Sequence, residues 1–384
     1  MSIAKPVLIS GAGIAGLSLA RSLRSHKIPF VLYERDSVGA SRTQGYRIRI
    51  SSQGQDALRA IMNADDYRRF EAGCSDNGAG KITPLDAVTL KAKTSGGPSG
   101  GAPGGGKVLG VDRAFLRNQL FEGIEDVVQF GKHTIGYALT ESGVIAKFAD
   151  GSESPEGSLL VGTDGVHSAV TKQLTKGQLK VFDTGARMIH GSSPFASFAG
   201  LGVGVFSLSE DSEKYGKLAM ITNVREGEEK LGWVLVGQPG SFSAPNDDFS
   251  LSGKPAADLS KEITSNWSTK VRPVLDDQVV EEAAFLKMAT SDPKGVPEWE
   301  QSPRVTLMGD AVHAMTPAGG VGANVALRDA EFLGRLLGSK GGWWNGVTEA
   351  FEKEMRVYAS ENVKHSFETA SRMFTIKDLK RTIN

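Results

Sequence analysis

Cysteine is almost missing from this sequence: Cys74 is the single cysteine among 384 residues, so no disulfide can form within the chain. Such a composition is typical of a reducing compartment. Long apolar runs are missing too, since no stretch approaches the roughly 18 apolar residues of a membrane-spanning helix. Residues 1–16 lack the apolar stretch of a signal peptide, and the last three residues are not a peroxisomal address. We therefore expect a cytoplasmic protein without a membrane span.

Net charge is also missing, because 44 lysines and arginines balance 44 aspartates and glutamates. A nucleic-acid binder normally carries a surplus of positive charge, so we expect no nucleic-acid partner. The histidines show no pair at the spacing of metal ligands and form no visible catalytic triad, so we expect no metal site. They are His26, His133, His167, His190, His313 and His365. Apolar residues make up 40% of the chain, which is enough to bury a core and excludes wholesale disorder.

Glycine, by contrast, is abundant, with 47 residues or about 12% of the chain against a usual ~7%. Seven of them lie among the fourteen residues 94–107, a segment with too few apolar side chains to pack. We expect a flexible, glycine-rich insertion over residues 81–104. This insertion is either a disordered spacer or a lid over a binding site, and a spacer is the commoner case.

Other glycines form a motif that is typical of dinucleotide binding. An apolar strand over residues 6–10 precedes the segment Gly11, Ala12, Gly13, Ile14, Ala15 and Gly16, which opens a helical pattern. The first glycine permits a tight turn, the second lets the backbone approach a pyrophosphate, and the third lets helix and strand pack closely. The N-terminus of the helix adds free N–H groups and a partial positive charge.

A second apolar strand, over residues 30–33, ends at an acidic residue, Glu34. The two strands and the helix between them form a βαβ unit with a right-handed crossover. A carboxylate at the end of the second strand can accept both ribose hydroxyls of an adenosine. Arg35, beside it, is either a contact of the adenine or a solvated charge.

Two further glycine-rich segments also follow apolar strands. Gly309 and Asp310 come after residues 304–308, at the carboxyl end of a strand, where parallel α/β sheets bind ligands. Residues 316–324 then open a helix whose N-terminus can face the electron-rich edge of a ring. Asp164 follows the apolar run 159–161 in the same manner. These acids and glycines predict that several loops converge on one ligand.

His313 lies within the second of these loops. A structural hydrogen bond is the commoner fate of such a histidine, and a general base is the alternative. Arg47 and Arg49 alternate on a predicted strand over residues 46–50 and therefore share one face. They either bind a ligand or lie on a solvated face of that strand.

The middle of the chain changes in character. Residues 200–210, 215–224 and 230–238 are predicted strands, and the last two are joined by a hairpin, which favours an antiparallel sheet. Met188, His190, Met220 and Trp233 belong to this sheet, but a register shift of one residue would reverse the face on which each lies. Residues 255–275 favour a helix, and the apolar spacing after Trp343 predicts a long one.

The three motifs together resemble those of FAD-dependent, single-component monooxygenases of the para-hydroxybenzoate hydroxylase type (class A). In that family a GxGxxG, a DG and a GD motif occur in this order, and here they stand at Gly11–Gly16, Asp164–Gly165 and Gly309–Asp310. The resemblance covers nearly the whole chain. It points towards salicylate hydroxylases, tetracycline-inactivating monooxygenases and fungal secondary-metabolite monooxygenases.

The resemblance implies an α/β fold in which a Rossmann-like FAD-binding domain is interleaved with an antiparallel β-sheet substrate domain, followed by a long C-terminal helix. The FAD-binding domain would be discontinuous, over residues 1–80, 105–175 and 285–342. The substrate-binding domain would span residues 176–284, and the C-terminal helix residues 343–384.

The resemblance also implies roles for particular residues. Gly11 to Gly16 would hold the pyrophosphate and Glu34 the ribose, whereas Gly45 and Arg113 would lie beside the flavin. Asp164 would brace the site and Asp310 would bind the ribityl or pyrophosphate part. The isoalloxazine would be lined by Pro317, Gly320, Val321, Gly322 and Ala323. The residues expected nearest the chemistry are Pro317, His313 and Arg47. One residue departs from the family pattern: Thr171 stands where an arginine linked to NAD(P)H use commonly follows the DG motif.

FAD as cofactor and NAD(P)H as co-substrate are implied with these residues. NAD(P)H would reduce the FAD, O₂ would add to the reduced ring at C4a, and the resulting hydroperoxide would oxygenate the substrate in a dry pocket. The substrate class is an aromatic or polycyclic small molecule, and hydroxylation is the simplest outcome. Epoxidation, Baeyer–Villiger insertion and non-oxygenating chemistry on the same scaffold stay open. A monomer or a weak dimer is expected.

Overall fold

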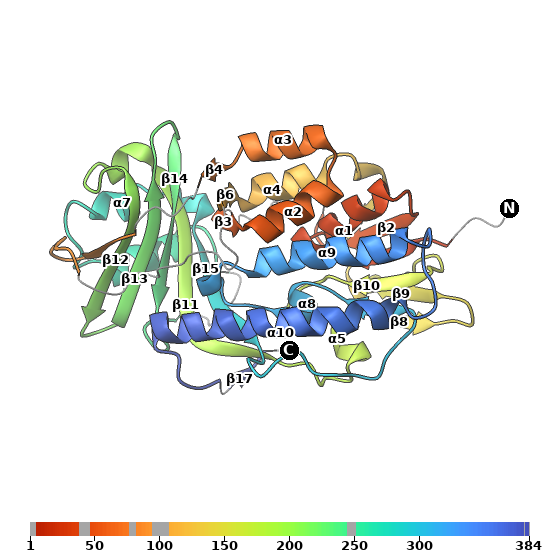
Figure 1. The fold of residues 1–384 in the computed structure, drawn as a ribbon. Helices are drawn as coiled ribbons and strands as arrows, with labels where there is room; N and C mark the ends of the chain where they lie inside the picture. The colour runs from red at the N-terminus through yellow and green to blue at the C-terminus, as the bar shows by residue number, and fades with distance from the viewer. Residues whose placement is uncertain are drawn as a thin grey trace.

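Two β-sheets lie side by side in the computed structural model, which describes residues 5–37, 47–76, 82–93, 107–243, 251–379 and 381–383 (Figure 1). One sheet has five strands in the order β16-β10-β1-β2-β7, and every neighbouring pair is parallel. Its strands are β1 (Val7–Ser10), β2 (Phe30–Glu34), β7 (Val128–Phe130), β10 (Leu159–Gly162) and β16 (Val305–Leu307). The short buried strands of this sheet read as near-continuous apolar runs because both of its faces are covered.

Helices and a hairpin cover the parallel sheet. Helix α1 packs on α9, α2 and α4, while the β8–β9 hairpin packs on β10 and brings Phe148 against Tyr33 of β2, with ring centroids 4.7 Å apart. The helices are α1 (Ile14–Ser25), α2 (Ser52–Ile61), α3 (Ala64–Ala72), α4 (Arg113–Phe121), α5 (Ala169–Leu174), α8 (Asp310–His313) and α9 (Gly322–Gly338). The hairpin strands are β8 (Thr134–Leu139) and β9 (Val144–Phe148). A small antiparallel sheet, made of β3 (Arg47–Ile50), β6 (Leu109–Asp112) and β4 (Ser75–Asp76), lies towards the second large sheet (Figure 1).

The second large sheet has seven strands, with the order β15-β11-β14-β13-β12-β5 and β17 paired to β11. They are β5 (Thr83–Asp86), β11 (Val181–Pro194), β12 (Gly204–Ser212), β13 (Gly216–Val224), β14 (Lys230–Gly237), β15 (Ala284–Ser291) and β17 (Arg381–Thr382). The predicted hairpin between β13 and β14 is present. Helices α6 (Lys254–Ile263) and α7 (Arg272–Asp276) pack on one face and share a separate apolar core with it.

The long C-terminal helix is α10 (Val347–Phe374), whose 28 residues correspond to about 42 Å. Figure 1 shows it running under both large sheets, from the parallel sheet at its start to the antiparallel sheet at its end. Its last turns pack Ala370 and Phe374 against Met188 and Val236 of the antiparallel sheet. The predicted fold class, an α/β FAD-binding fold with an antiparallel substrate-type sheet and a long final helix, is confirmed.

Three predicted segments differ in detail from the structure. Residues 255–275 form two helices: α6 ends at Ile263, and α7 begins at Arg272 with Pro273 in its first turn, where the missing N–H of proline costs no hydrogen bond. Residues 83–86, expected within the flexible insertion, form β5 and pair in parallel with β12. Strand β15, expected in the FAD-binding domain from residue 285 onwards, pairs with β11 of the antiparallel sheet. Residues 94–106 of the predicted insertion lie outside the described residues.

Candidate functional site

The three motifs meet at the carboxyl ends of β1, β10 and β16. Thr163 follows β10 and donates its hydroxyl to the carbonyl oxygens of Ser10 and Gly11, at 2.7 and 2.8 Å. A Cβ added to Gly309, after β16, would lie 2.8 Å from the Cβ of Ala15. Loops that are about 150 and about 290 residues apart in the chain are therefore in contact, as the parallel-sheet rule predicts.

The glycines of the first motif satisfy different steric demands. Gly11 has φ +104°, a region that L side chains rarely adopt, and a Cβ there would lie 2.7 Å from the Thr163 carbonyl oxygen. A Cβ on Gly16 would overlap the carbonyl oxygen of Gly11. A Cβ on Gly13 would meet nothing within 4 Å, and no side chain caps α1 at that residue. The space in front of the helix N-terminus is therefore open at the position expected to face a pyrophosphate.

Glu34 is buried, with 8% of its surface exposed, and it fixes the glycine loop. Its carboxylate accepts the backbone N–H of Ala12 at 2.7 Å and that of Asp36 at 2.9 Å. Each carboxylate oxygen has a second acceptor direction, so ribose hydroxyls can still bind. Arg35 is exposed, and its Nε lies 3.8 Å from an Asp36 oxygen, which matches a solvated charge.

Helix α4 places a second arginine near the same loop. Arg113 opens this helix after Asp112, whose side chain caps it by accepting the N–H of Phe115 at 3.0 Å. Arg117, one turn later, donates its Nε to the carbonyl oxygen of Ala12 at 3.2 Å. Sequence reasoning missed Arg117, although its four-residue spacing from Arg113 already places both on one side of the helix.

Asp310 begins α8 directly after Gly309, which has φ +60°. The Asp310 side chain is exposed, yet so much protein surrounds it that burial raises the pKa of its carboxyl, while His313 and Arg113 act to lower it. Asp310 is therefore a carboxylate that lies deep in the protein, is still accessible and can accept hydrogen bonds.

His313, at the end of α8, is fully buried. Its Nε2 lies 2.6 Å from Asp329, so this ring nitrogen donates to a carboxylate of α9. Burial acts to lower the pKa of His313, but the Asp329 and Asp310 carboxylates outweigh it, and the pKa is raised. This position corresponds to the structural hydrogen bond expected as the commoner fate of His313.

The segment Pro317 to Ala323 connects α8 and α9. Pro317 is exposed at the start of a single 3₁₀ turn (Pro317–Gly319), and Gly320 has φ +61°. A Cβ on Gly320 would lie 3.4 Å from Cδ of Arg49, so the turn faces strand β3. Val321 is buried, whereas Gly322 and Ala323 are partly exposed at the start of α9.

Asn324, to which the sequence analysis gave no role, fixes this turn. Its amide donates to the carbonyl oxygens of Arg49 and Gly320, at 2.9 and 3.0 Å. Its side-chain oxygen accepts the N–H of Ser51 at 2.8 Å. One buried asparagine therefore links the junction of β3 and α2 to the turn expected beside the isoalloxazine. In the sequence, Asn324 is only an asparagine shortly after the glycines. Its role could not be predicted because its partners, Arg49 and Ser51, are distant in the chain.

Asp164 accepts the hydroxyl of Ser168 at 2.6 Å, and burial raises the pKa of its carboxyl. Thr171, the departure from the family pattern, is 3% exposed and donates its hydroxyl to the carbonyl oxygen of Ala311 at 2.7 Å. It thus ties α5 to α8 from inside the protein. A buried arginine could not be accommodated there without a partner for its charge.

The guanidinium group of Arg47 forms most of its hydrogen bonds with the small sheet. Its Nη2 donates to Ser75 at 2.7 Å and to the carbonyl oxygen of Gly110 at 2.8 Å, and its Nη1 lies 3.5 Å from Glu228. Glu228 also pairs with Arg225 at 2.6 Å. Arg47 therefore joins β3, β4 and β6 to the β13–β14 hairpin. Gly45, expected beside the flavin, lies outside the described residues.

The register of the antiparallel sheet decides which of its side chains face the half that contains the parallel sheet. Met188 pairs with Val236, and both pack with Ala370 of α10 and, more loosely, with Ala318 of the turn after Pro317. His190, two residues on, shares that face. Its pKa is lowered to about 4 by burial and then by the Arg113 guanidinium, which places it towards α4.

Met220 and Trp233 lie on the opposite face. Met220 pairs with Leu235 and packs in the core beneath α6 and α7, where Trp233 is also buried. The Trp233 indole donates to Ser193 at 2.9 Å. Of the four sheet residues singled out from the sequence, two therefore face the flavin-binding half and two belong to a core that lies away from it.

Comparison with known proteins identifies the family. Residues 122–341, more than half of the chain, match the protein family described as FAD binding domain. The chain belongs to this family. The resemblance found from the three motifs is thereby confirmed.

A curated relative is the dual O-methyltransferase/FAD-dependent monooxygenase elcB of Phaeosphaeria nodorum, which is 34% identical over 380 residues. That match covers 87% of this chain and 40% of the relative. The chain spans less than half the length of the first curated relatives it matches, from 40% to 47%. More than half of each of these relatives therefore has no counterpart in this chain.

Solved structures share the fold over nearly the whole chain. A provisionally assigned FAD-containing monooxygenase of Photorhabdus luminescens has a TM-score of 0.78 and 27% identity, covering 97% of this chain and 99% of its own. A substrate complex of a salicylate hydroxylase has a TM-score of 0.69 and 20% identity, covering 97% and 90%. The second comparison is similar in fold alone.

The residues of this FAD-family chain fit the cofactor. The open space before Gly13 suits a pyrophosphate, the buried Glu34 carboxylate suits ribose hydroxyls, and the accessible Asp310 carboxylate suits the ribityl chain. The described residues contain no group of three or more histidines, cysteines, aspartates or glutamates placed to hold an ion. Within the same residues, no helix combines the length and the apolar character that crossing a membrane requires.

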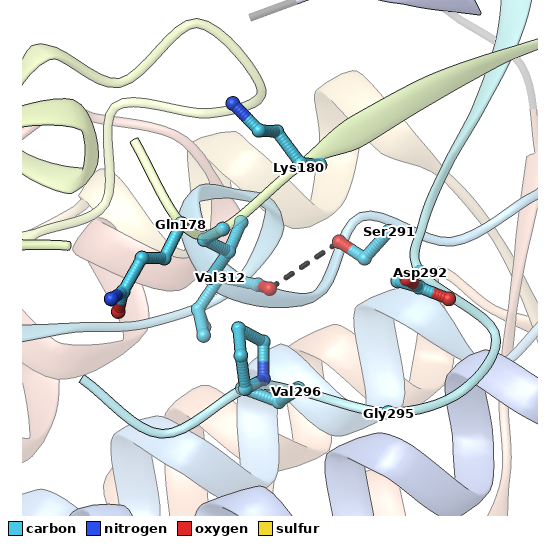
Figure 2. A pocket seen from close by; sticks show the side chains of 9 residues that line it. Gln178, Lys180, Ser291, Asp292, Gly295, Val296 and Val312 are labelled. Carbon is cyan, nitrogen blue, oxygen red and sulfur yellow. Dashed lines mark hydrogen bonds between the residues drawn. The ribbon is translucent and has the colours of Figure 1, made fainter. Parts of the chain in front are cut away.

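Two cavities lie away from the motifs. Figure 2 shows one of about 80 Å³ behind Val312 of α8, where the Ser291 hydroxyl donates to the Val312 carbonyl oxygen at 3.3 Å. Pockets for small-molecule ligands usually measure ~300–1,000 Å³, so this cavity is too small for an aromatic substrate. The other, of about 310 Å³, lies at the opposite end of the parallel sheet, next to Arg304 and Trp343. Neither cavity is lined by the flavin motifs apart from Val312.

Proposed function

We propose that this chain is an FAD-dependent monooxygenase that uses NAD(P)H and O₂ to oxygenate, in the simplest case to hydroxylate, an aromatic or polycyclic small molecule. The observation that carries the proposal is the convergence of three distant motifs at one sheet edge, facing the apolar side of a separate antiparallel sheet. The names of the curated relatives, which include FAD-dependent monooxygenase, support it.

When bound, FAD supplies the redox and oxygen chemistry that no amino-acid side chain offers. The protein's part is to bind and orient. The α1 N-terminus at Gly13 would hold the pyrophosphate, Glu34 the ribose, and Asp310 with Arg113 the ribityl region. The turn from Pro317 to Ala323, fixed by Asn324, would lie beside the ring.

The antiparallel sheet would supply the substrate side. Met188, Val236 and Leu286 form an apolar surface on the face towards the turn after Pro317, and such a surface excludes water from a reactive intermediate. His190 adds one polar group to that face. With its pKa lowered to about 4 it is neutral at physiological pH and can donate or accept one hydrogen bond. A hydroxylated aromatic fits this arrangement, and the O-methyltransferase named in the first relatives would also act on an oxygen.

The proposal includes a cytoplasmic location and a monomer or weak dimer. Cys74 supports the location, since a single half-buried thiol whose pKa is raised to about 11, chiefly by burial, is unreactive and needs no oxidising compartment. Ala370 and Phe374 of helix α10 cover part of the apolar sheet face, so less of that face is open to an obligate partner.

The test begins with the cofactor and proceeds to the product. Purified protein should show flavin absorbance, and NADH or NADPH oxidation should accelerate when a panel of phenols and polycyclic phenols is added. With labelled O₂, the product should gain one ¹⁸O atom, and its mass and structure separate hydroxylation and epoxidation from Baeyer–Villiger insertion. A folded Asp310→Ala protein should lose FAD. Bound flavin without any ¹⁸O incorporation would instead indicate a non-oxygenating flavoprotein.

A further inference from the structure

Asp329, in the middle of α9, is a carboxylate with no exposed surface, and it accepts three hydrogen bonds. One oxygen accepts the backbone N–H of Gly309 at 3.0 Å and Nε2 of His313 at 2.6 Å. The other accepts the hydroxyl of Tyr358, on α10, at 2.6 Å. Figure 1 shows α8 lying between α9 and α10, so these bonds join three consecutive parts of the fold.

The bonds to Asp329 hold both ends of α8. Gly309 immediately precedes this four-residue helix and His313 ends it, so Asp310 lies between the two attachment points. Gly309 is buried and in the left-handed region, with φ +60°, so its N–H needs a partner within the protein. The direction in which Asp310 leaves the backbone is thus set by a carboxylate twenty residues further along the chain.

Charge provides a second link between the same residues. Burial acts to lower the pKa of His313, but Asp329 on α9 and Asp310 on its own helix outweigh it, so the protonated ring is favoured. Burial also raises the pKa of Asp310, and the two cations that oppose this are His313 and Arg113 of α4. A charged Asp329 therefore favours a charged His313, which in turn favours an ionised Asp310.

We propose that Asp329 is a positioning residue for FAD, which holds the Gly309–Asp310 turn and the His313 ring in the arrangement that lets Asp310 bind the cofactor. This rests on the cofactor part of the proposed function and not on the reaction. Tyr358 extends the arrangement to α10, and Arg328 covers its ring, with the guanidinium carbon 3.8 Å from the ring centroid. The C-terminal helix would thereby contribute to cofactor binding without touching the cofactor.

A purely structural role is the alternative, and the chain offers a matched control for it. Glu352 on α10 is also a carboxylate with no exposed surface; it accepts the hydroxyl of Thr306 at 2.9 Å and an Arg356 N–H at 2.9 Å. Neither of these two hydrogen bonds involves Gly309 or α8. Removing its charge by Glu352→Gln perturbs a similarly buried network and should lower stability without changing the affinity for FAD.

The experiment measures FAD binding to protein stripped of flavin, in Asp329→Asn, Glu352→Gln and the wild type. We expect the dissociation constant for FAD to rise about 10- to 100-fold in Asp329→Asn, as for the loss of hydrogen bonds to a buried charge, and less than twofold in Glu352→Gln. Tyr358→Phe removes one bond of the three and should give a smaller rise, of about threefold or more. Tyr358→Phe therefore also tests the inference if Asp329→Asn does not fold.

The pH dependence of FAD binding gives a readout that general destabilisation would not produce. In the wild type, the charges of His313 and Arg113 act to lower the pKa of Asp310, so its carboxyl group stays ionised down to a lower pH. In Asp329→Asn the His313 ring loses its charged partner, so FAD binding should weaken at a higher pH, by about half a unit or more. Equal affinities in Asp329→Asn and Glu352→Gln, coincident pH profiles, or unchanged binding in Tyr358→Phe would each overturn the inference.

The two proposals fail separately. A wild-type protein that binds FAD but oxygenates no substrate would contradict the proposed reaction and leave the role of Asp329 standing. Unchanged FAD binding in Asp329→Asn would contradict the role of Asp329 and leave the reaction standing.

Discussion

Gly13 and Gly16 give a sharp test of where the cofactor binds, because the same substitution should have opposite consequences three residues apart. In Gly16→Ala the new methyl group would overlap the Gly11 carbonyl oxygen and lie 2.7 Å from Oγ1 of Thr163. The first of these contacts is with backbone at the crossing of β1 and α1, so rotation of a side chain cannot relieve it. In Gly13→Ala the methyl group would meet nothing within 4 Å, and φ is −75°, which alanine adopts freely.

The expected magnitudes follow from these contacts. Overpacking of this kind costs about 3 kcal/mol in the free energy of unfolding for Gly16→Ala. For 384 residues the unfolding entropy is about 0.8 kcal/mol/K, so the melting temperature should fall by about 4 °C. Gly13→Ala loses some preference for the N-cap position but restricts the unfolded chain, so its stability should change by less than about 1 kcal/mol.

Gly13→Ala should weaken FAD binding although it barely changes the stability of the protein. The methyl group of Gly13→Ala occupies the space in front of the α1 N-terminus, where the pyrophosphate is expected, so FAD binding should weaken at least about tenfold, or 1.4 kcal/mol. The assay combines thermal unfolding of flavin-free protein with titration of FAD followed by flavin fluorescence. Wild-type affinity in Gly13→Ala would refute the placement of the pyrophosphate, and an unchanged melting temperature in Gly16→Ala would refute the packing argument.

Four other substitutions test single residues. His190 has its pKa lowered to about 4, below its usual 6.5, so the stability it provides is complete above pH 6.5 and is lost as the pH falls towards 4. Denaturant titration of the wild type should therefore give a lower free energy of unfolding at pH 4.5 than at pH 7. In His190→Gln this difference should be smaller, by up to about 3 kcal/mol. Met188→Ala should raise KM for a substrate, whereas Trp233→Phe should lower stability by about 1 kcal/mol and leave KM unchanged. Thr171→Val leaves the Ala311 carbonyl without its donor and should lower the melting temperature by about 2 °C.

The sequence predicted the convergence of the three motifs at one sheet edge well, because its signals are local. The strand–glycine–helix pattern at Gly11–Gly16 and the acid at Glu34 depend on residues within one βαβ unit. Once three such units are assigned to one parallel sheet, the carboxyl ends of their strands must share an edge. The structure brings Thr163 and Gly309 against that first loop without further assumptions.

The supporting residues could not be found in this way, because their role depends on partners far away in the chain. Asn324 binds Ser51, and Asp329 binds Tyr358, across distances in sequence that no local pattern records. An asparagine or aspartate within an apolar helix signals only that some buried partner exists. Arg117 is the exception, since its helical spacing from Arg113 already indicated the side on which it lies.

The two faces of the antiparallel sheet show most clearly what a sequence pattern cannot predict. Alternation along β11 separates Met188 and His190 from Ile189, but it does not say which set faces the flavin-binding half. A register shift between Asp183 and Arg187 interrupts the pairing with β15, because four steps along β11 there correspond to two along β15. The excess is even, so the alternation of faces still carries through to His190. What decides the face is the end of α10, which packs Ala370 and Phe374 onto Met188. The contacts with α10 and with Ala318, and not the strand's own pattern, therefore determine which face of the sheet lies towards the turn after Pro317.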